Sequence, residues 1–168
     1  MNFNFCPSCG TEGSVKKQDA TNYECEKCSW HHWNNAKAAT SIAFIKDGKL
    51  LVVQRAHEPN KGLHELAGGF VDFGESAYEG AIREAREELG ITLTPADLEL
   101  TALYMNNYDS DVSTVDIVFT VRTWRGEFRP ADDVAAISWE PLSFIYDPTF
   151  YQMYDGLDKK ILALLEKQ

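Results

Sequence analysis

The chain has 168 residues, of which 44% are apolar and 25% are charged, and its formal net charge is −10. These values are typical of a globular protein and exclude a disordered, collagen-like or coiled-coil chain. Uncharged apolar runs fall far short of the ~20 residues that a membrane span needs, so no membrane partner is expected. The acidic balance argues against coating of nucleic acid, although phosphates can still bind through a bridging metal cation.

The four cysteines lie in two Cys-x2-Cys pairs, Cys6 with Cys9 and Cys25 with Cys28, separated by fifteen residues. Residues 1–5 lack the basic start and apolar stretch of a secretory signal, so we predict a cytoplasmic protein with reduced cysteines. Two such pairs at this spacing predict a tetrahedral Zn²⁺ site, and four thiolates leave no open position, which makes the zinc structural. The alternative is four free buried cysteines or a redox pair.

Residues 1–36 are predicted to form this zinc ribbon, and residues 37–168 the main domain, with Asn34-Asn35 as the linker. Three lysines in the ribbon are outweighed by four acidic residues, which is a poor footprint for nucleic acid. We therefore interpret the ribbon as a docking or dimerisation element, compatible with a homodimer.

The main domain alternates extended and helical patterns. Extended runs at 40–45 and 50–53 flank Asp47-Gly48, a strong hairpin signal. A glycine-rich loop over 57–75, with a short strand near Leu66, precedes a helix from Glu75 to Leu89 that Gly90 ends. The remaining predicted elements are strands over 98–104, 115–121 and 135–139 and an amphipathic C-terminal helix around 161–165. This order predicts an α/β or α+β sandwich.

The helix over 75–89 has two contrasting faces. An apolar stripe should face the core, whereas Glu84, Glu87 and Glu88, spaced i, i+3 and i+4, share the other face. A solvated acidic face is one interpretation. The other is a magnesium site, because the glycine-rich loop over 68–74 can add backbone carbonyl oxygens to carboxylates, the hard ligands that Mg²⁺ prefers.

Residues 69–91 resemble the signature of the Nudix hydrolase family, Gly-x5-Glu-x7-Arg-Glu-U-x-Glu-Glu-x-Gly-U, where U is a bulky aliphatic residue. Every fixed position matches, and only Ala85 is smaller than the usual U residue. A zinc ribbon ahead of this signature is similar to the architecture of the NADH pyrophosphatase branch. The resemblance implies a Nudix-type α/β/α sandwich with a mixed sheet, preceded by the ribbon.

The resemblance also implies roles for the signature residues. Glu84, Glu87, Glu88 and the Gly69 carbonyl would bind catalytic Mg²⁺ or Mn²⁺, and Arg83 would pair with Glu75 to orient the loop and helix. The alternative for Arg83 is a surface i, i+4 pair with Glu79 or Glu87. A general base could come from Glu87 or Glu88, or from Asp132, Asp133 or Glu140, although residues of this kind are more often surface charges.

The implied reaction is hydrolysis of the pyrophosphate bond of a nucleoside diphosphate linked to another group, of the NADH, FAD, ADP-ribose or dinucleoside polyphosphate type, with release of a nucleoside monophosphate. Arg55, His64 and Tyr108 are the candidate contacts to this small-molecule nucleotide, and a salt bridge, space filling and core packing are their respective alternatives. Rival functions are a nucleoside triphosphate or RNA 5′-end pyrophosphohydrolase and a ligand-sensing domain without turnover, although a sensor would be expected to have lost one of the carboxylates.

Overall fold

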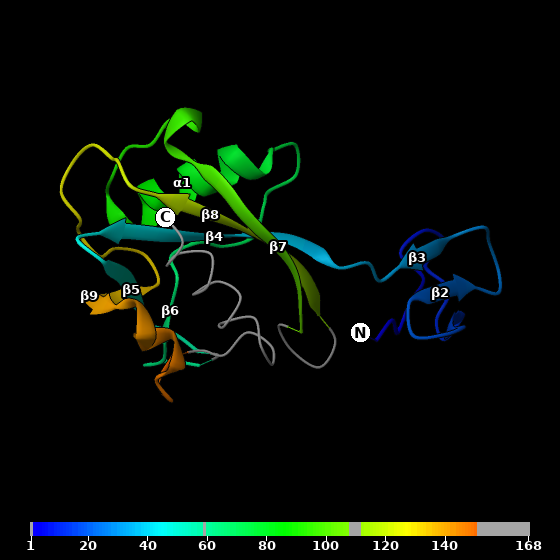
Figure 1. Cartoon of the computed structure of the whole chain (residues 1–168). Helices are drawn as coiled ribbons and strands as arrows, with labels where there is room; N and C mark the ends of the chain where they lie inside the picture. The colour runs from blue at the N-terminus through cyan, green and yellow to red at the C-terminus, as the bar shows by residue number, and fades with distance from the viewer. Residues whose placement is uncertain (1, 59, 108–111, 151–168) are drawn as a thin grey trace.

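The computed structural model of the chain describes residues 2–58, 60–107 and 112–150. These residues form a three-stranded sheet, a six-stranded sheet and one α-helix (Figure 1). The elements are β1 (Val15–Lys17), β2 (Asn22–Cys25), β3 (His31–Trp33), β4 (Lys37–Lys46), β5 (Lys49–Arg55), β6 (His64–Glu65), α1 (Ala77–Leu89), η1 (Pro95–Asp97), β7 (Glu99–Asn107), β8 (Ser113–Val121), β9 (Val134–Pro141) and η2 (Leu142–Tyr146), where η denotes a 3-10 helix. Within the described ranges, no helix is long and apolar enough to cross a membrane.

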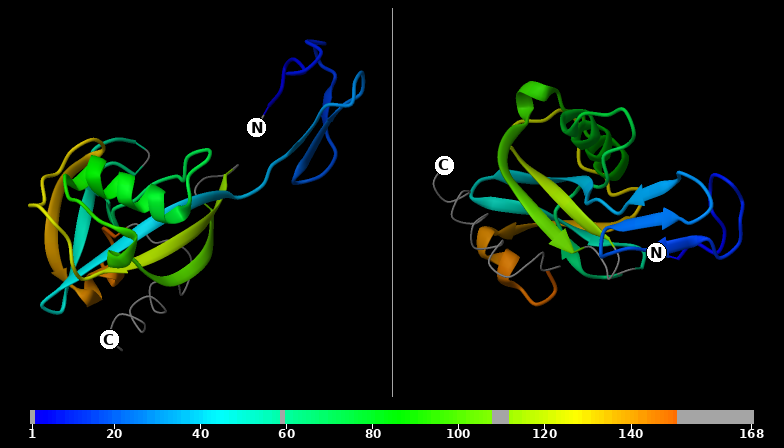
Figure 2. Two further views of the ribbon diagram at one scale, coloured as in Figure 1. Left: turned by 90° about the horizontal axis from the view of Figure 1, so that it is seen from above. Right: turned by 90° about the vertical axis from the view of Figure 1, so that its right-hand side faces the viewer.

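Strands β1, β2 and β3 form a small antiparallel sheet around the cysteine pairs. Figures 1 and 2 show it beside the larger sheet, joined to it by the start of β4. Its interior is aromatic, because the Phe3 ring packs edge-on against Tyr23, Trp30 and His32 with centroids 5.2 to 5.6 Å apart. A ribbon this small has little apolar core of its own, and small domains of this kind commonly depend on a bound metal for stability.

The six-stranded sheet has the order β6-β5-β4-β8-β7, and β9 pairs with β5. Strands β4 and β8 run parallel, whereas the other pairs are antiparallel, so the sheet is mixed. The hairpin between β4 and β5 turns at Asp47-Gly48, as predicted, with φ values of 52° and 71°. Two successive positive φ values are the geometry of the tight hairpin turns that Asp-Gly favours.

Alternating side chains of the sheet build a core on each face. Ile42 and Phe44 of β4 pack with Phe119 of β8 against the buried stripe of α1, and Ala43 and Val118 pack on the opposite face. Figure 2 shows α1 along one face of the sheet and η2 beyond the other. The Nudix-type layering is therefore confirmed for the described residues, while the predicted C-terminal helix lies outside them.

The helix α1 begins at Ala77, two residues later than predicted, because Ser76 is its N-cap. The Ser76 hydroxyl accepts from the Glu79 N–H, and the Glu79 side chain accepts from the Ser76 N–H, which is a complete capping box. The helix ends at Gly90, whose φ of 67° is the left-handed conformation predicted for that glycine.

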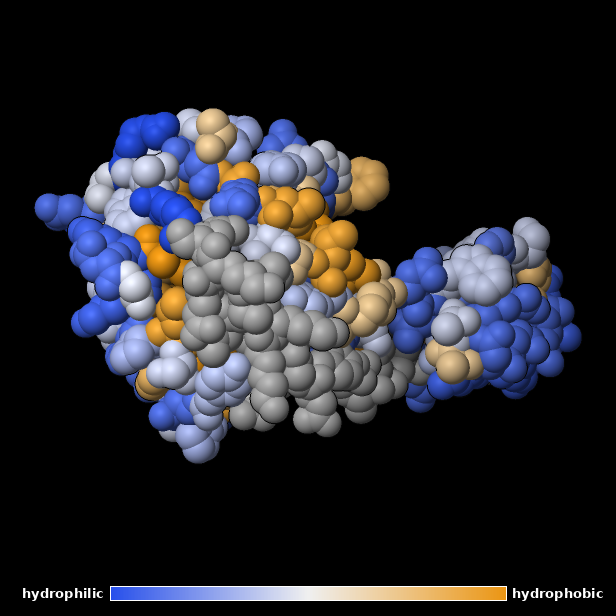
Figure 3. All heavy atoms as spheres, in the orientation of Figure 1, coloured by the Kyte–Doolittle hydropathy of each residue, from blue (hydrophilic) through white to orange (hydrophobic). Residues whose placement is uncertain are grey.

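The surface of the two parts differs in polarity. In the space-filling view the ribbon is mainly hydrophilic, whereas apolar side chains gather over the edge strand β7 (Figure 3). Leu100, Leu103 and Met105 of that strand are 50%, 60% and 57% exposed. The exposed apolar surface therefore lies along an edge strand.

Candidate active site

The loop that precedes α1 is attached to the first half of β4 by backbone hydrogen bonds. The Thr40 N–H donates to the Gly69 carbonyl oxygen at 2.8 Å, and the Val71 N–H donates to the Ala38 carbonyl oxygen at 3.0 Å. The chain passes through Gly68 with a φ of 143°, a conformation that favours glycine. The loop backbone is therefore held in place by the sheet.

Gly68→Ala is expected to lower the free energy of unfolding by about 2–4 kcal/mol, whereas Gly69→Ala should change it little. A Cβ at residue 68 would overlap the Thr40 carbonyl group, which is part of the sheet backbone. A Cβ at residue 69 would overlap only the carboxylate of Glu84, the end of a flexible side chain. Urea unfolding of both variants measures the difference, and equal stabilities would contradict this packing of the loop.

Glu88 in the last turn of α1 is buried beneath this loop, with 4% of its surface exposed. Its Oε2 accepts a hydrogen bond from the Gly68 N–H at 2.8 Å. Burial raises the pKa of Glu88 to about 9, with further contributions from Asp133 and Glu84, although the Gly68 N–H opposes the shift. The solvated interpretation of the acidic face therefore does not hold for Glu88.

Metal-free protein is expected to lose stability as the pH rises from about 4.5 to about 9. A carboxyl group whose pKa is raised on folding binds its proton more tightly in the folded state. Its contribution to the free energy of unfolding is complete below the pKa of the unfolded state and is lost as the pH rises to the pKa of the folded state. The slope for one proton is about 1.4 kcal/mol per pH unit. Urea unfolding at several pH values in chelator measures the slope, which Glu88→Gln should flatten; an unchanged slope would contradict the assignment.

Glu84 lies one turn before Glu88, half-buried, with its carboxylate directly beside the Cα of Gly69. The absence of a side chain at Gly69 makes this approach to the loop possible. Burial raises the pKa of Glu84, and the hydrogen bond from Arg83 opposes the rise. Two carboxylates of α1 thus converge on the backbone of the glycine loop.

Arg83 links the loop to the helix. Its Nε and one terminal nitrogen contact the two carboxylate oxygens of Glu75 at 2.9 and 3.0 Å, and it donates to the Phe70 carbonyl oxygen at 2.9 Å. The other terminal nitrogen contacts Glu84 at 2.8 Å and Glu87 at 3.0 Å. The hydrogen bonds from Arg83 to Glu75 lower the pKa of Glu75. The structure thus places Arg83 in both predicted pairings, with Glu75 and with Glu87.

The donor set fits a hard divalent cation. Glu84 and Glu88 are carboxylates at a backbone loop. Asp133 raises the pKa of both, and Glu84 also raises the pKa of Glu88, a repulsion that a cation would relieve. The Gly69 carbonyl oxygen accepts from the Thr40 N–H at 2.8 Å and, at the longer distance of 3.5 Å, from the Thr40 hydroxyl, a weak bond that a cation could replace. The Glu87 carboxylate shares the Arg83 contact with Glu84 but is 48% exposed. Three similar glutamates therefore occupy three different environments.

A cavity of about 150 Å³ opens beside the loop, on the sheet face opposite α1. Its walls are Ala39, Thr40, Ser41, Arg55, Glu65, Leu66, Gly68, Gly69, Phe70, Asn106, Thr114, Asp116 and Asp133. Arg55 and Glu65 form an ion pair in the wall. The predicted contact residue Arg55 therefore faces the cavity. It also forms a salt bridge, which was the alternative role considered for it.

Of the candidate bases Asp132, Asp133 and Glu140, Asp133 is the one that lines this cavity. It raises the pKa of Glu65, Glu84 and Glu88, which places its charge near all three. Asp132 is exposed and Glu140 pairs with Leu50 in the sheet. Sequence reasoning did not separate the three residues, because contacts between distant segments place Asp133: β9 pairs with β5, and the Ala131 N–H donates to the Glu88 carbonyl oxygen.

The other two predicted contact residues lie elsewhere. The His64 Nδ1 is 3.2 Å from the Thr149 hydroxyl, and its ring packs edge-on against Phe144, so among the described residues it is outside the cavity wall. Tyr108 lies outside the described residues. The sequence analysis also missed Asn106, Thr114 and Asp116, although polar residues at alternate positions of an apolar strand were a usable signal.

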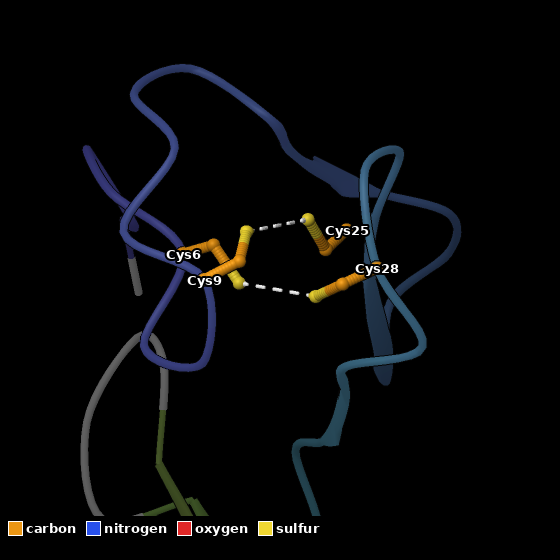
Figure 4. A group of neighbouring side chains, drawn as sticks. All are labelled: Cys6, Cys9, Cys25 and Cys28. Carbon is orange, nitrogen blue, oxygen red and sulfur yellow. Dashed lines mark hydrogen bonds between the residues drawn. The ribbon is translucent and has the colours of Figure 1, made fainter.

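The four cysteine sulfurs of the ribbon lie within 4.8 Å of one another and point inward (Figure 4). The Sγ atoms of Cys6 and Cys28 are 3.7 Å apart, and those of Cys9 and Cys25 are 3.8 Å apart. A tetrahedral site with Zn–S bonds of about 2.3 Å requires sulfurs separated by about 3.8 Å. The hydrogen bond with Ser14 is the main cause that lowers the pKa of Cys25 to about 6. The cluster therefore fits an N-terminal zinc ribbon.

Comparison with known proteins adds a sequence match. The family profile of the NUDIX domain matches residues 34–162. An ADP-ribose pyrophosphatase of Methanocaldococcus jannaschii is 37% identical over 120 residues, which cover 71% of this chain and 66% of that protein. A NAD-capped RNA hydrolase NudC of Vibrio cholerae is 30% identical over 90 residues, which cover 54% of this chain and 33% of that protein. The chain thus spans about two thirds or less of these curated relatives.

Solved structures show the same fold. The crystal structure of a NUDIX hydrolase from Nitrosomonas europaea superposes with a TM-score of 0.73 at 22% identity, and the match covers 99% of this chain and 92% of that one. At this identity the likeness supports the fold alone.

Proposed function

The chain belongs to the NUDIX domain family, and from this premise we propose that it hydrolyses the pyrophosphate bond of a nucleoside diphosphate linked to another group, releasing a nucleoside monophosphate. The observation that carries the proposal is the convergence of Glu84 and Glu88 on the backbone of Gly68 and Gly69, two residues that also line the cavity. The relative named as an ADP-ribose pyrophosphatase supports ADP-ribose as the first substrate to test.

Glu84, Glu88 and the Gly69 carbonyl would hold Mg²⁺ or Mn²⁺. Glu87 would become a further ligand if its carboxylate left Arg83. A bound divalent cation neutralises phosphate charge and lowers the pKa of water. The Glu75–Arg83 pair positions the loop against α1, and Arg83 also holds the Glu84 carboxylate. Arg55 can contact a phosphate oxygen from the cavity wall.

Hydrolysis joins the oxygen of water to one phosphorus and breaks the bridging bond from that phosphorus to oxygen. The leaving phosphate keeps the bridging oxygen, and the proton of water passes to a carboxylate. Asp133 is our preferred acceptor over Asp132 and Glu140, because it lines the cavity beside Glu84 and Glu88. Glu87 and Glu88 remain the alternatives within the signature.

A substrate panel tests the proposal. The purified full chain would be incubated with Mg²⁺ and ADP-ribose, NADH, FAD, a dinucleoside polyphosphate, a nucleoside triphosphate or NAD-capped RNA, and the products separated by chromatography. Release of AMP from ADP-ribose is the expected result. Pyrophosphate from the triphosphate alone would favour the triphosphatase, cleavage of the capped RNA alone would favour an RNA 5′-end enzyme, and binding without any product would favour the sensor.

The ribbon is proposed to carry a structural Zn²⁺ on its four cysteines and to serve docking or dimerisation. A boundary between residues 36 and 37 agrees with the start of β4 at Lys37. The homodimer and the cytoplasmic location stay predictions. The exposed apolar edge strand β7 offers one surface for such a dimer.

A further inference from the structure

Asp116 is a buried carboxylate that the proposed chemistry does not use. It lies in β8, opposite Ala39 of β4 and Tyr104 of β7, and only 4% of its surface is exposed. Its neighbours Thr114 and Asn106 are equally enclosed, at 1% and 5% exposure. Burying a carboxylate costs free energy unless it is hydrogen-bonded, so a residue of this type in a strand interior calls for a physical explanation.

Part of that cost is offset by two neighbours. The Thr114 hydroxyl donates to the Asp116 Oδ2 at 3.1 Å, and the Asn106 amide also donates to this carboxylate. A carboxylate offers about four acceptor positions, and these are the two donors that the described residues supply. Asp116, Thr114 and Asn106 all line the cavity, which leaves acceptor capacity at its surface.

The same cavity reaches the glycine loop. Phe70 of the loop pairs with Ala39, and Ala39 pairs with Asp116, so the loop and Asp116 are separated by one intervening strand. Two strand spacings amount to about 10 Å. A nucleotide whose phosphates lie at Gly68 and Gly69 can therefore extend across β4 and place its nucleoside near Asp116.

We propose that Asp116, supported by Asn106 and Thr114, is the specificity-determining subsite for the nucleoside, accepting hydrogen bonds from its neutral donors, either the ribose hydroxyls or a base amino group. This inference rests on the proposed function. The negative carboxylate repels phosphate, so it orients the ligand with its phosphates at the glycine loop. A site built to bond such donors rejects analogues that lack them.

The test is Asp116→Asn, with Thr120→Val as the matched control. Thr120 is a buried polar residue on the same strand and face, bonded to Thr101 and outside the cavity wall. For ADP-ribose we expect Asp116→Asn to raise KM about 10- to 100-fold with little change in kcat, because a charged acceptor is replaced by a neutral amide, half of which donates, in ground and transition states alike. Thr120→Val should leave KM unchanged.

Substrate analogues identify the donor. If the ribose is recognised, 2′-deoxy-ADP-ribose should show the raised KM with the wild type and no further rise with Asp116→Asn. If the base is recognised, the inosine analogue should behave in this way. A KM for Asp116→Asn equal to that of the wild type, or a fall in kcat and thermal stability alone, would overturn the proposal.

A binding measurement separates this inference from the proposed function. If the wild type hydrolyses none of the panel, the proposed function fails, and calorimetric titration of ADP-ribose into wild type and Asp116→Asn still tests the subsite. Weaker binding by the variant supports the subsite, and equal binding overturns it.

Discussion

Glu88→Gln is expected to reduce hydrolysis about 10²- to 10³-fold while the protein keeps its fold. The substitution removes the charge that would hold the divalent cation and preserves the size of the side chain. The amide oxygen can still accept from the Gly68 N–H, and the amide N–H can donate to Asp133. Since burial raises the pKa of Glu88 to about 9, the neutral amide resembles the protonated acid of metal-free protein at neutral pH.

The matched control is Glu79→Gln, the same chemical change in the first turn of α1, away from Glu84, Glu87 and Glu88. Glu79 accepts from Ser76 in the capping box, and glutamine fills this role equally well. Steady-state rates with Mg²⁺ and thermal unfolding of both variants measure the outcome. A rate near that of the wild type for Glu88→Gln would show that catalysis does not depend on this carboxylate.

Cys6→Ser is expected to abolish stoichiometric zinc and to unfold the ribbon. The substitution removes one of the four sulfur ligands that lie at tetrahedral spacing. Metal binding supplies about 10–16 kcal/mol to small zinc domains of this type. Elemental analysis gives the zinc content. The change in tryptophan fluorescence relative to the wild type reports on the ribbon through Trp30, which stacks on His32 and contacts Phe3, because Trp124 and Trp139 lie in the main domain.

Ser8→Ala is the control for the ribbon, because Ser8 is exposed between Cys6 and Cys9. It should retain one zinc per chain and an unchanged fluorescence spectrum. Hydrolysis by the main domain should survive Cys6→Ser within a few-fold, since its carboxylates and cavity come from residues 39–133. Wild-type protein purified without chelator and free of zinc would refute the ribbon assignment.

Local signals account for the parts of the fold that the sequence predicted well. The Asp47-Gly48 turn, the Ser76 capping box and Gly90 each act within a few residues, so the hairpin and the helix were predictable. The paired cysteines likewise indicated their own cluster. The bounds were less exact: α1 starts two residues later than predicted, because Ser76 caps it from outside, and the strands β4 (Lys37–Lys46) and β5 (Lys49–Arg55) are longer than the predicted runs.

The site was less predictable, because it depends on contacts between distant strands. The spacing of Glu84, Glu87 and Glu88 indicated one shared face, but burial beneath the loop separates Glu88 from exposed Glu87. Asp116 reaches the cavity through the parallel pairing of β4 with β8. No periodicity along one segment encodes that pairing.

The parallel pairing of β4 with β8 also affects how the protein reaches its folded state. These neighbours are far apart in sequence, with β5, β6, α1 and β7 between them. Bringing them together closes a long segment of chain, and such non-local contacts slow folding. During synthesis the glutamates of α1 emerge well before β8, so a partly made chain has its acidic helix but no complete pocket. The metal site and the nucleoside subsite should therefore form together, late in folding.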